Sequence, residues 1–263
     1  MKNSVGEKKV NTKKIASKKT TDFWRITRYV ILLVVWVFCS VVASQVVVGL
    51  IMGLFLDAET LNTPVVSGLY SVFSYGIALF LIIFVPPRVA EKWTKNGQKT
   101  MAASREELGL KDLPTWTDIG LGVVGYIVST LLAMGLVWLF SSLPWFNAGQ
   151  SQDTGFGPFM SGGEKIIAFL VLVVAAPIVE EIIFRGWLYG KLRARLNAVV
   201  SVLIVSVLFG IMHFQWNVGV NVFALSVVLC ILREITGTIY AGILTHMIKN
   251  GIAFYLLYVV GFG

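Results

Sequence analysis

The chain has 263 residues, of which 56% are hydrophobic and only 14% are charged, and its mean hydropathy is +0.79. This composition excludes an ordinary water-soluble domain and indicates an integral membrane protein. The formal charge of +8 could suggest nucleic-acid binding, but residues 1–25 hold eight Lys and Arg against two acidic residues, so the rest of the chain is nearly neutral. We therefore predict a basic cytoplasmic tail at an anionic lipid surface, and no nucleic-acid partner.

Seven apolar stretches follow the tail. About 20 apolar residues cross the hydrocarbon core of a bilayer, so each stretch is a candidate membrane-spanning helix. They cover residues 29–55, 66–86, 118–140, 165–184, 198–213, 219–232 and 237–259. The fifth and sixth are short, and we expect them to be tilted, partly re-entrant, or covered by neighbouring helices instead of lipid. The sequence thus predicts an all-α, polytopic transmembrane helical bundle of seven to eight spans.

The connections between these stretches differ in positive charge. Six Lys and Arg lie in 87–117, whereas 57–65 and 141–163 contain none. Because positively charged loops remain in the cytoplasm, the N-terminus, the 87–117 connection and the Arg185–Arg195 stretch are predicted to lie inside, and the other two connections outside. Within the long connection, residues 104–110 carry a helix start signal and are expected to form a short interfacial helix.

Ionisable side chains within the predicted spans are concentrated in the second half of the chain. Each costs roughly 2.5–3.5 kcal/mol at the centre of a membrane, so each needs a structural or chemical reason. The first three spans hold almost none, whereas the second half of the chain holds, within its spans or directly beside them, the ionisable Glu180, Glu181, Arg185, His213, Arg233, Glu234, His246 and Lys249, and the amide Asn250. This contrast predicts membrane scaffold helices over 26–145 and a catalytic core over 146–263.

The spacing of these residues separates the two glutamates. Glu181 and Arg185 are four residues apart and share a helix face, so Arg185 can neutralise Glu181. Glu180 points about 100° away from Glu181 and is left to face another group. Pro177 removes a backbone donor just upstream and is expected to loosen the helix there. A helix end at the water interface would explain the same charges without any chemistry.

Two further pairs repeat the four-residue spacing. Phe209 and His213 can stack ring on ring, and His246 and Asn250 share a face of the last span. A single histidine near a span end is more often an interfacial residue, but an acid, two imidazoles and an amide together can activate water and hold an oxyanion. If the fourth and fifth helices were straight and upright, Glu180 and His213 would lie at different depths in the membrane. We therefore expect the fourth helix to continue, tilted, through Arg195, which places Glu180 near the middle of the membrane.

At these residues the sequence resembles the type II CAAX prenyl endopeptidases and their bacterial relatives, the CAAX protease and bacteriocin-processing (Abi, CPBP) intramembrane proteases. The family's motifs Glu-Glu-x-x-x-Arg, Phe-x-x-x-His and His-x-x-x-Asn correspond to Glu180–Arg185, Phe209–His213 and His246–Asn250. They occur in the family's order over about residues 160–255. The resemblance implies an intramembrane endopeptidase acting on membrane-associated or lipidated peptides or proteins, in a bacterial plasma membrane.

The resemblance also implies residue roles. Glu180 would be the general base that polarises a water, assisted by His213. His246 and Asn250 would stabilise the oxyanion, while Glu181 and Arg185 would orient the first helix of the site. The family has been described both as zinc-dependent and as glutamate-dependent. We expect no cofactor; if zinc is used, its ligands would be Glu180, His213 and His246. The expected partners are a peptide or membrane-protein substrate and the lipid bilayer.

Two other functions fit the same residues. In a non-catalytic membrane regulator or bacteriocin self-immunity protein of this family, the motif residues would only hold the bundle together. In a transporter, intramembrane carboxylates and histidines would form a proton relay. The chain shows no internal repeat, which weighs against the transporter.

Overall fold

The computed structural model describes residues 3–93, 101–149, 154–157 and 160–261, and the regular secondary structure of these ranges is helical. Among the described residues, six helices are long and apolar enough to cross a membrane, and a seventh apolar helix is shorter. The chain is therefore a multi-pass, all-α helical bundle, which confirms the predicted fold class. The first two residues of the basic tail and parts of the 87–117 and 141–163 connections lie outside the described residues.

The helices follow the chain in groups. The first group is α1 (Asn3–Phe55), the single turn α2 (Ala58–Leu61) and α3 (Pro64–Trp93). Helix α5 (Trp116–Phe140) follows alone. A continuous run then consists of α6 (Gly162–Phe169), η1 (Leu170–Ala175), α7 (Ala176–Glu181), η2 (Ile182–Leu188) and α8 (Tyr189–Arg193), in which η1 and η2 are π-helical. The last group is α9 (Ala198–Ile211), α10 (Trp216–Thr236), α11 (Tyr240–Phe254) and the π-helical η3 (Tyr255–Val260).

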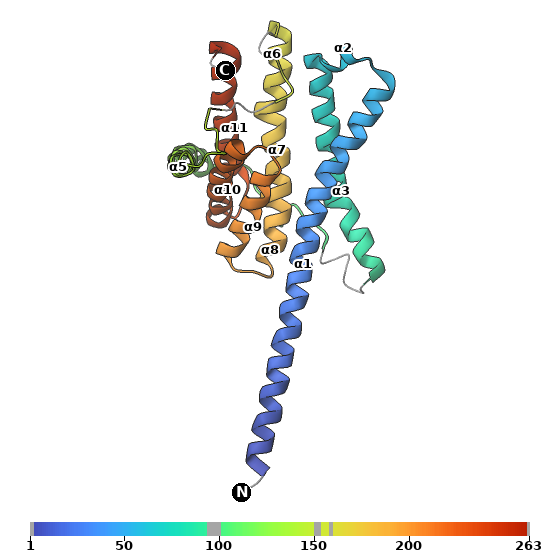
Figure 1. The fold of residues 1–263 in the computed structure, drawn as a ribbon, viewed down its shortest axis with the longest axis vertical. Coiled ribbons are helices and arrows are strands. Elements are labelled where there is room, and N and C mark those ends of the chain that lie inside the picture. Colours follow the sequence, from blue (N-terminus) through green and yellow to red (C-terminus); the bar gives the residue numbers. More distant parts are fainter. Residues whose placement is uncertain (1–2, 94–100, 150–153, 158–159, 262–263) are drawn as a thin grey trace.

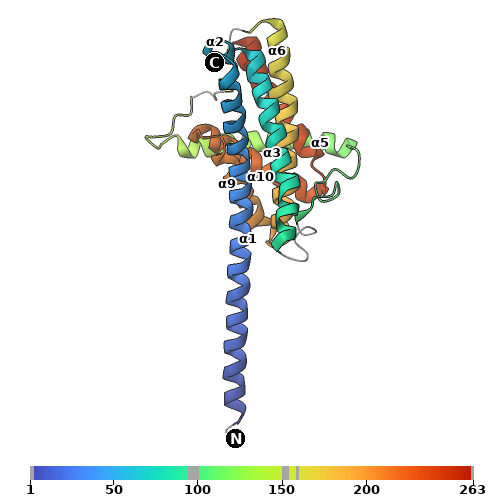
Figure 2. The same ribbon diagram turned by 90° about the vertical axis from the view of Figure 1, so that its right-hand side faces the viewer.

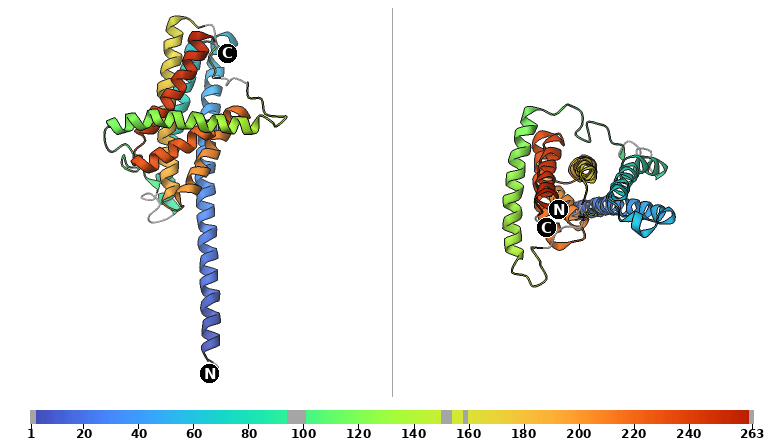
Figure 3. Two further views of the ribbon diagram at one scale, coloured as in Figure 1. Left: turned by 90° about the vertical axis from the view of Figure 1, so that its left-hand side faces the viewer. Right: turned by 90° about the horizontal axis from the view of Figure 1, so that it is seen from above.

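The helices form layers from one side of the molecule to the other. Seen from above, α5 lies on one side with α10 and α11 beside it, the 162–193 run lies in the middle, and α1 and α3 form the far side (Figure 3). Helix α5 packs on α10 and α11, α10 packs on α9, and α1 packs on α3. The middle layer, which carries both glutamates, is therefore covered on two sides by protein.

Helix α5 has the length and composition of a membrane span, yet it lies across the other helices (Figure 3). Small residues permit this close crossing. A Cβ at Gly122 would lie 2.8 Å from Leu244 Cδ2, and one at Gly125 would lie 2.6 Å from the Thr245 hydroxyl oxygen. The same hydroxyl donates to the carbonyl oxygen of Gly122 at 2.9 Å. Glycine at both positions thus lets α11 approach the backbone of α5.

The fifth and sixth predicted stretches have unequal lengths. Helix α9 has 14 residues and is as short as expected, whereas α10 has 21 residues. The expectation of a short sixth helix is wrong, because polar residues at both ends, such as Asn217 and Glu234, continue the helix instead of ending it. Gly237 terminates α10 in the left-handed conformation, with φ +71°.

The predicted interfacial helix at 104–110 is also wrong, since only one turn forms there. The start signal is present: the Ser104 backbone N–H donates to Glu107 at 3.1 Å, and the Glu107 N–H donates to the Ser104 hydroxyl at 3.1 Å. Gly109 then adopts φ +74° and closes the turn. Its carbonyl oxygen accepts a hydrogen bond from the Ile239 N–H at 3.2 Å, so the segment is tied to the start of α11.

The two ends of the bundle differ in charge. The first part of α1 projects alone beyond one end, which we call the N-terminal end (Figure 2). Basic residues of other segments lie near this end: Arg195 stacks on the Tyr29 ring of α1 at 5.3 Å, and Lys191 Nζ lies 3.6 Å from Glu107 Oε2. At the opposite end, called the α2 end, α2 lies near the start of α6 and the C-terminus (Figure 1).

A large apolar core fills the bundle toward the N-terminal end. Its fully buried side chains come from α1, α3, η2, α8 and α9 and include Val37, Ile82, Trp187, Leu192 and Val205. Apolar side chains packed at this density leave no room for water. The core therefore closes the space between α1, α3 and the 162–193 run on that side of the two glutamates.

Candidate active site

The helix that carries the two glutamates is longer than the apolar stretch in its sequence. It runs without a break for 32 residues from Gly162 to Arg193. Glu180 therefore lies near the middle of the helix, as the expected extension of this helix required, although the helix ends at Arg193 and not at Arg195. Helix α9 ends after 14 residues, so its last turn also lies inside the bundle. Glu180 and His213 thus line the same cavity, and the difference in depth expected for upright helices is not found.

Glu181 and Arg185 form the predicted pair. Arg185 Nη1 lies 2.9 Å from Glu181 Oε1, and neither side chain has any exposed surface. The Arg185 guanidinium also lies over the Phe209 ring, 4.5 Å from its centre. A buried carboxylate needs such a partner, because an isolated charge in this environment is strongly unfavourable.

His246 links the two glutamates. Its Nδ1 lies 3.1 Å from Glu181 Oε1, and its Nε2 lies 3.8 Å from Glu180 Oε2. A carboxylate only accepts, so Nδ1 carries the hydrogen in this bond and Nε2 faces Glu180. Gly242, one turn earlier on α11, permits the approach, since a Cβ there would lie 3.1 Å from Glu181 Oε2. A chain of polar contacts thus runs from Arg185 to Glu180.

Glu180 differs from Glu181 in its surroundings. Its side chain keeps 19% of its surface exposed, whereas that of Glu181 is fully buried. Its Oε1 accepts a hydrogen bond from the hydroxyl of Tyr75 on α3 at 2.9 Å. Sequence reasoning missed Tyr75, which is one of several residues with a hydroxyl in the second apolar stretch. The contact joins residues 105 positions apart, which no local spacing can reveal.

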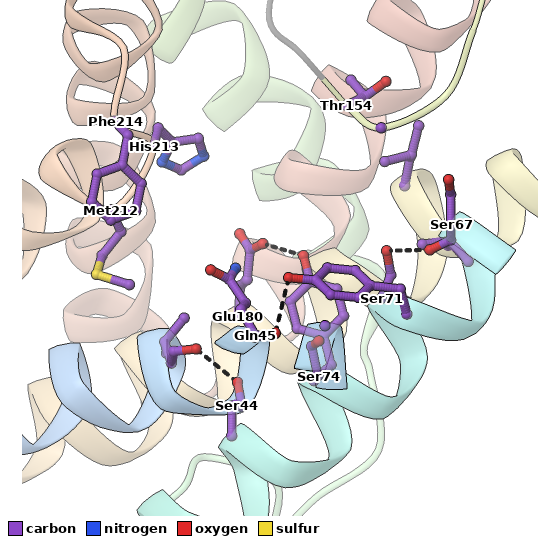
Figure 4. A pocket seen from close by; sticks show the side chains of 18 of the residues that line it. Ser44, Gln45, Ser67, Ser71, Ser74, Thr154, Glu180, Met212, His213 and Phe214 are labelled. Carbon is purple, nitrogen blue, oxygen red and sulfur yellow. Dashed lines mark hydrogen bonds between the residues drawn. The ribbon is translucent and has the colours of Figure 1, made fainter. Parts of the chain in front are cut away.

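Glu180 and His213 line one cavity of about 880 Å³ (Figure 4). His213 follows α9, and its Nδ1 lies 2.8 Å from the carbonyl oxygen of Phe209. A carbonyl only accepts, so Nδ1 carries the hydrogen and Nε2 is left for the cavity. The Phe209 ring packs against both imidazoles, with ring centres 5.1 Å from His213 and 6.0 Å from His246. Phe214, with φ 53°, turns the chain sharply after the histidine.

Asn250 has a different environment. Its Nδ2 donates to the Leu172 carbonyl oxygen at 2.9 Å. In the π-helical η1, Ala176 N–H bonds to Val171 O, five residues back. The matching partner of Leu172 O would be Pro177, which has no N–H. Asn250 therefore supplies the hydrogen-bond donor that Pro177 lacks. The expected loosening of the helix around Pro177 is thus the loss of the backbone hydrogen bond to the Leu172 carbonyl.

Asn250 and Lys249 line a second cavity of about 320 Å³. Leu172 and Thr154 line both cavities, so the two spaces adjoin. The nearly buried His246 lies between the glutamates, whereas Asn250 lines the neighbouring cavity and not the cavity that contains Glu180 and His213. Of the predicted residues, Glu180, Glu181, Arg185, His213 and His246 are brought closest together.

Arg233 and Glu234 belong to a separate network. Glu234 Oε1 lies 2.7 Å from Arg193 Nη2, and the Tyr189 hydroxyl donates to Glu234 Oε2 at 2.6 Å. Arg233 donates to the carbonyl oxygens of Glu107 and Gly237. These charges join α8, α10 and the 104–110 turn near the N-terminal end. The polar residues of the second half therefore form two clusters, and only one lies at the 880 Å³ cavity.

The zinc hypothesis requires three ligands around one point, since catalytic zinc usually has three protein ligands. Among the residues that the structure describes, no three His, Cys, Asp or Glu side chains are grouped closely enough to hold a metal ion. His213 directs Nδ1 to a backbone carbonyl and His246 directs Nδ1 to Glu181. Both bonds leave Nε2 of the ring free, as in zinc-binding histidines, so only the spacing of the three groups weighs against zinc, and independence from metal stays a prediction.

Comparisons with known proteins show similarity to membrane peptidases. The sequence profile of the family described as "Type II CAAX prenyl endopeptidase Rce1-like" matches residues 162–252, the part of the chain that contains all three motifs. A curated protein of Bacillus subtilis (strain 168), named "Putative membrane peptidase YdiL", is 24% identical over 185 residues, which are 70% of this chain and 69% of that protein. No solved structure matches the chain with significant similarity. Residues 162–252 are thus similar in sequence to the Rce1-like type II CAAX prenyl endopeptidases, and a larger part of the chain is similar to the membrane peptidase of Bacillus subtilis.

Proposed function

We propose that the protein is an intramembrane endopeptidase that hydrolyses peptide bonds of membrane-associated or lipidated peptides and proteins. The observation that carries this proposal is the chain of polar contacts from Arg185 through Glu181 and His246 to Glu180, which ends at the 880 Å³ cavity. Buried ionisable groups are unfavourable in a membrane and usually have a function. Here they end at a partly exposed carboxylate beside a second imidazole.

Glu180 acts as the general base. One of its oxygens accepts from Tyr75, which fixes the carboxylate. A water that donates one hydrogen to Glu180 and the other to His213 Nε2 has a lone pair left to attack the carbonyl carbon of a peptide bond. Transfer of the first proton to Glu180 makes that water a nucleophile, and Glu180 later gives the proton to the leaving amine.

His246 and Asn250 stabilise the oxyanion of the tetrahedral intermediate. The His246 Nδ1 lies 3.1 Å from Glu181 Oε1, which fixes the orientation of the ring, and a doubly protonated ring has an Nε2–H that can donate to the oxyanion. The Asn250 amide has two N–H bonds, and only one is used by Leu172. Losing one donor of this kind costs about 10²–10³ in rate.

We further propose that the protein resides in the plasma membrane of a bacterial cell with its N-terminus in the cytoplasm. Support comes from the basic tail and from the basic residues near the N-terminal end of the bundle, such as Lys191 and Arg195. Positively charged segments of this kind remain on the cytoplasmic side. The α2 end then faces outward.

Membrane proteomics tests this function without knowledge of the substrate. Membranes containing the wild type are compared with membranes containing Glu180→Gln, and the expected result is a set of peptide ends found only with the wild type. The matched control is Glu106→Gln, since Glu106 is exposed and distant from the cavity. Identical peptide ends in all three samples would favour the non-catalytic regulator or self-immunity protein.

A further inference from the structure

One wall of the cavity is formed by hydroxyl groups from the N-terminal helices. Ser67, Ser71 and Ser74 lie at four- and three-residue spacing on one face of α3, and Ser44 and Gln45 face them from α1 (Figure 4). Two of these hydroxyls donate to carbonyls of their own helix: Ser71 to Ser67 at 2.9 Å, and Ser44 to Val41 at 2.7 Å. Their lone pairs therefore remain free to accept hydrogen bonds.

The cavity extends from the middle of the bundle to the α2 end. Its lining includes Met52 near the end of α1, Leu61 of α2 and Val66 in the first turn of α3. Glu180 and His213 line the same cavity at its inner part. The serine wall lies between these two regions, so a hydroxyl-lined path joins the α2 end to the carboxylate.

Toward the N-terminal end, the lining stops at apolar residues. Ala78 and Ile183 line the cavity and also belong to the apolar core. Behind them lie Ile82 and Trp187, which are 0% and 1% exposed. Trp187 also lines a separate cavity of about 620 Å³ near the N-terminal end, whose lining includes Glu107 and Lys191 and shares no residue with that of the first cavity. Ile82 and Trp187 therefore separate the first cavity from the space at the N-terminal end.

We infer that water and an extended segment of substrate reach Glu180 from the α2 end, through the serine-lined part of the cavity. Backbone N–H and C=O groups cannot remain unpaired inside a membrane, and hydroxyls that accept and donate can satisfy them. The substrate class is therefore a polypeptide segment exposed on the face of the membrane opposite the N-terminal tail. This inference rests on the proposed peptidase function and on the proposed orientation.

Cysteine labelling with a membrane-impermeant maleimide tests the route. The parent protein carries Cys39→Ser, since Cys39 is exposed, and keeps the fully buried Cys230. In intact cells, Ser71→Cys is expected to react at least 10-fold faster than Val72→Cys. Val72 is the matched control because it is adjacent and 51% exposed on the outer surface of α3, where lipid would surround it. Arg195→Cys should react only in inside-out vesicles.

Two results would overturn the inference: reaction of Ser71→Cys only in inside-out vesicles, or no faster reaction than Val72→Cys from either side. Melting in detergent verifies that both variants fold. Labelling does not require hydrolysis, so it is repeated in the Glu180→Gln background, where the same accessibility is expected. A protein that proves inactive can therefore still show the route, and an active protein can still refute it.

In an active protein, the maleimide adduct at Ser71→Cys should also reduce product formation at least 10-fold, and an unchanged rate contradicts the substrate path.

Discussion

The helices on the two sides of the cavity contribute different chemistry. Helices α7, η2 and α11 supply ionisable groups in contact with one another, such as Glu181, Arg185 and His246. Helices α1 and α3 supply neutral hydroxyls, of which Tyr75 reaches the carboxylate of Glu180. The comparison shows that charge is tolerated within the bundle where partners hold it, while the facing wall offers polarity without charge.

The difference also separates two kinds of function. The paired charges fix the geometry of a few atoms, because each partner restricts the other. The hydroxyl wall fixes no single geometry, since a hydroxyl rotates and both donates and accepts. We therefore expect substitutions on the charged side to act on rate or on folding, and substitutions on the hydroxyl side to act more weakly.

The largest effect on rate is expected for Glu180→Gln. The amide cannot accept a proton from water, so the rate of peptide hydrolysis should fall at least about 10³-fold, within the range for loss of general base catalysis. The melting temperature should stay close to that of the wild type, because Glu180 is partly exposed and is not the partner of Arg185. Retained activity in Glu180→Gln, with Glu106→Gln as control, would refute the assignment of the base.

Arg185→Ala should act mainly on stability. It leaves the fully buried Glu181 without its guanidinium, and breaking a buried pair costs about 3–5 kcal/mol. Thermal melting in detergent and the amount of folded protein in membranes measure the effect. Arg193→Ala is the comparison, because its pair with Glu234 is partly exposed and is worth much less. An unchanged melting temperature in Arg185→Ala would show that the pair does not support the fold.

Asn250→Ala should lower both rate and stability. The rate falls about 10²–10³-fold if the amide holds the oxyanion, and the uncovered Leu172 carbonyl costs about 1–3 kcal/mol. Adding Pro177→Ala restores a backbone N–H to pair with that carbonyl. We expect the double variant to regain melting temperature without regaining rate. Recovery of both would mean that Asn250 only supports the helix.

Tyr75→Phe tests the contribution of the hydroxyl side to the charged side. It removes one hydrogen bond to the Glu180 carboxylate and should lower the rate about 10-fold, since bonds to charged groups are worth about 1.5–3 kcal/mol. Tyr70→Phe, on the same helix and in the same cavity, should change the rate less than 2-fold, because the Tyr70 hydroxyl contacts the Gln45 carbonyl at 3.3 Å. If the two substitutions lowered the rate equally, the hydrogen bond from Tyr75 to Glu180 would have no specific role in catalysis.

The smallest effect is expected from metal removal. A protein that works through Glu180 and His213 should keep its rate after treatment with a strong chelator and dialysis. A zinc enzyme would lose its rate and regain it on addition of stoichiometric Zn²⁺, with an affinity that falls in acid as the histidine ligands are protonated. That second result would overturn metal independence and leave the peptidase proposal standing.

The sequence alone determined the features that depend on local spacing. The apolar stretches gave the membrane bundle, and the four-residue intervals gave the pairs Glu181 with Arg185 and Phe209 with His213. Such pairs form whenever the segment is helical, because residues one turn apart are neighbours on any helix. The predicted division of the chain into 1–25, 26–145 and 146–263 remains a prediction.

Tertiary structure decided everything that joins distant segments. Tyr75 meets Glu180, Asn250 covers the carbonyl that Pro177 leaves open, and α5 turns across the bundle on its glycines. The spacing of Ser67, Ser71 and Ser74 places them on one face of a helix, but it does not show whether that face meets a cavity or another helix. These contacts depend on the relative placement of helices, and periodicity within one segment carries no information about its neighbours.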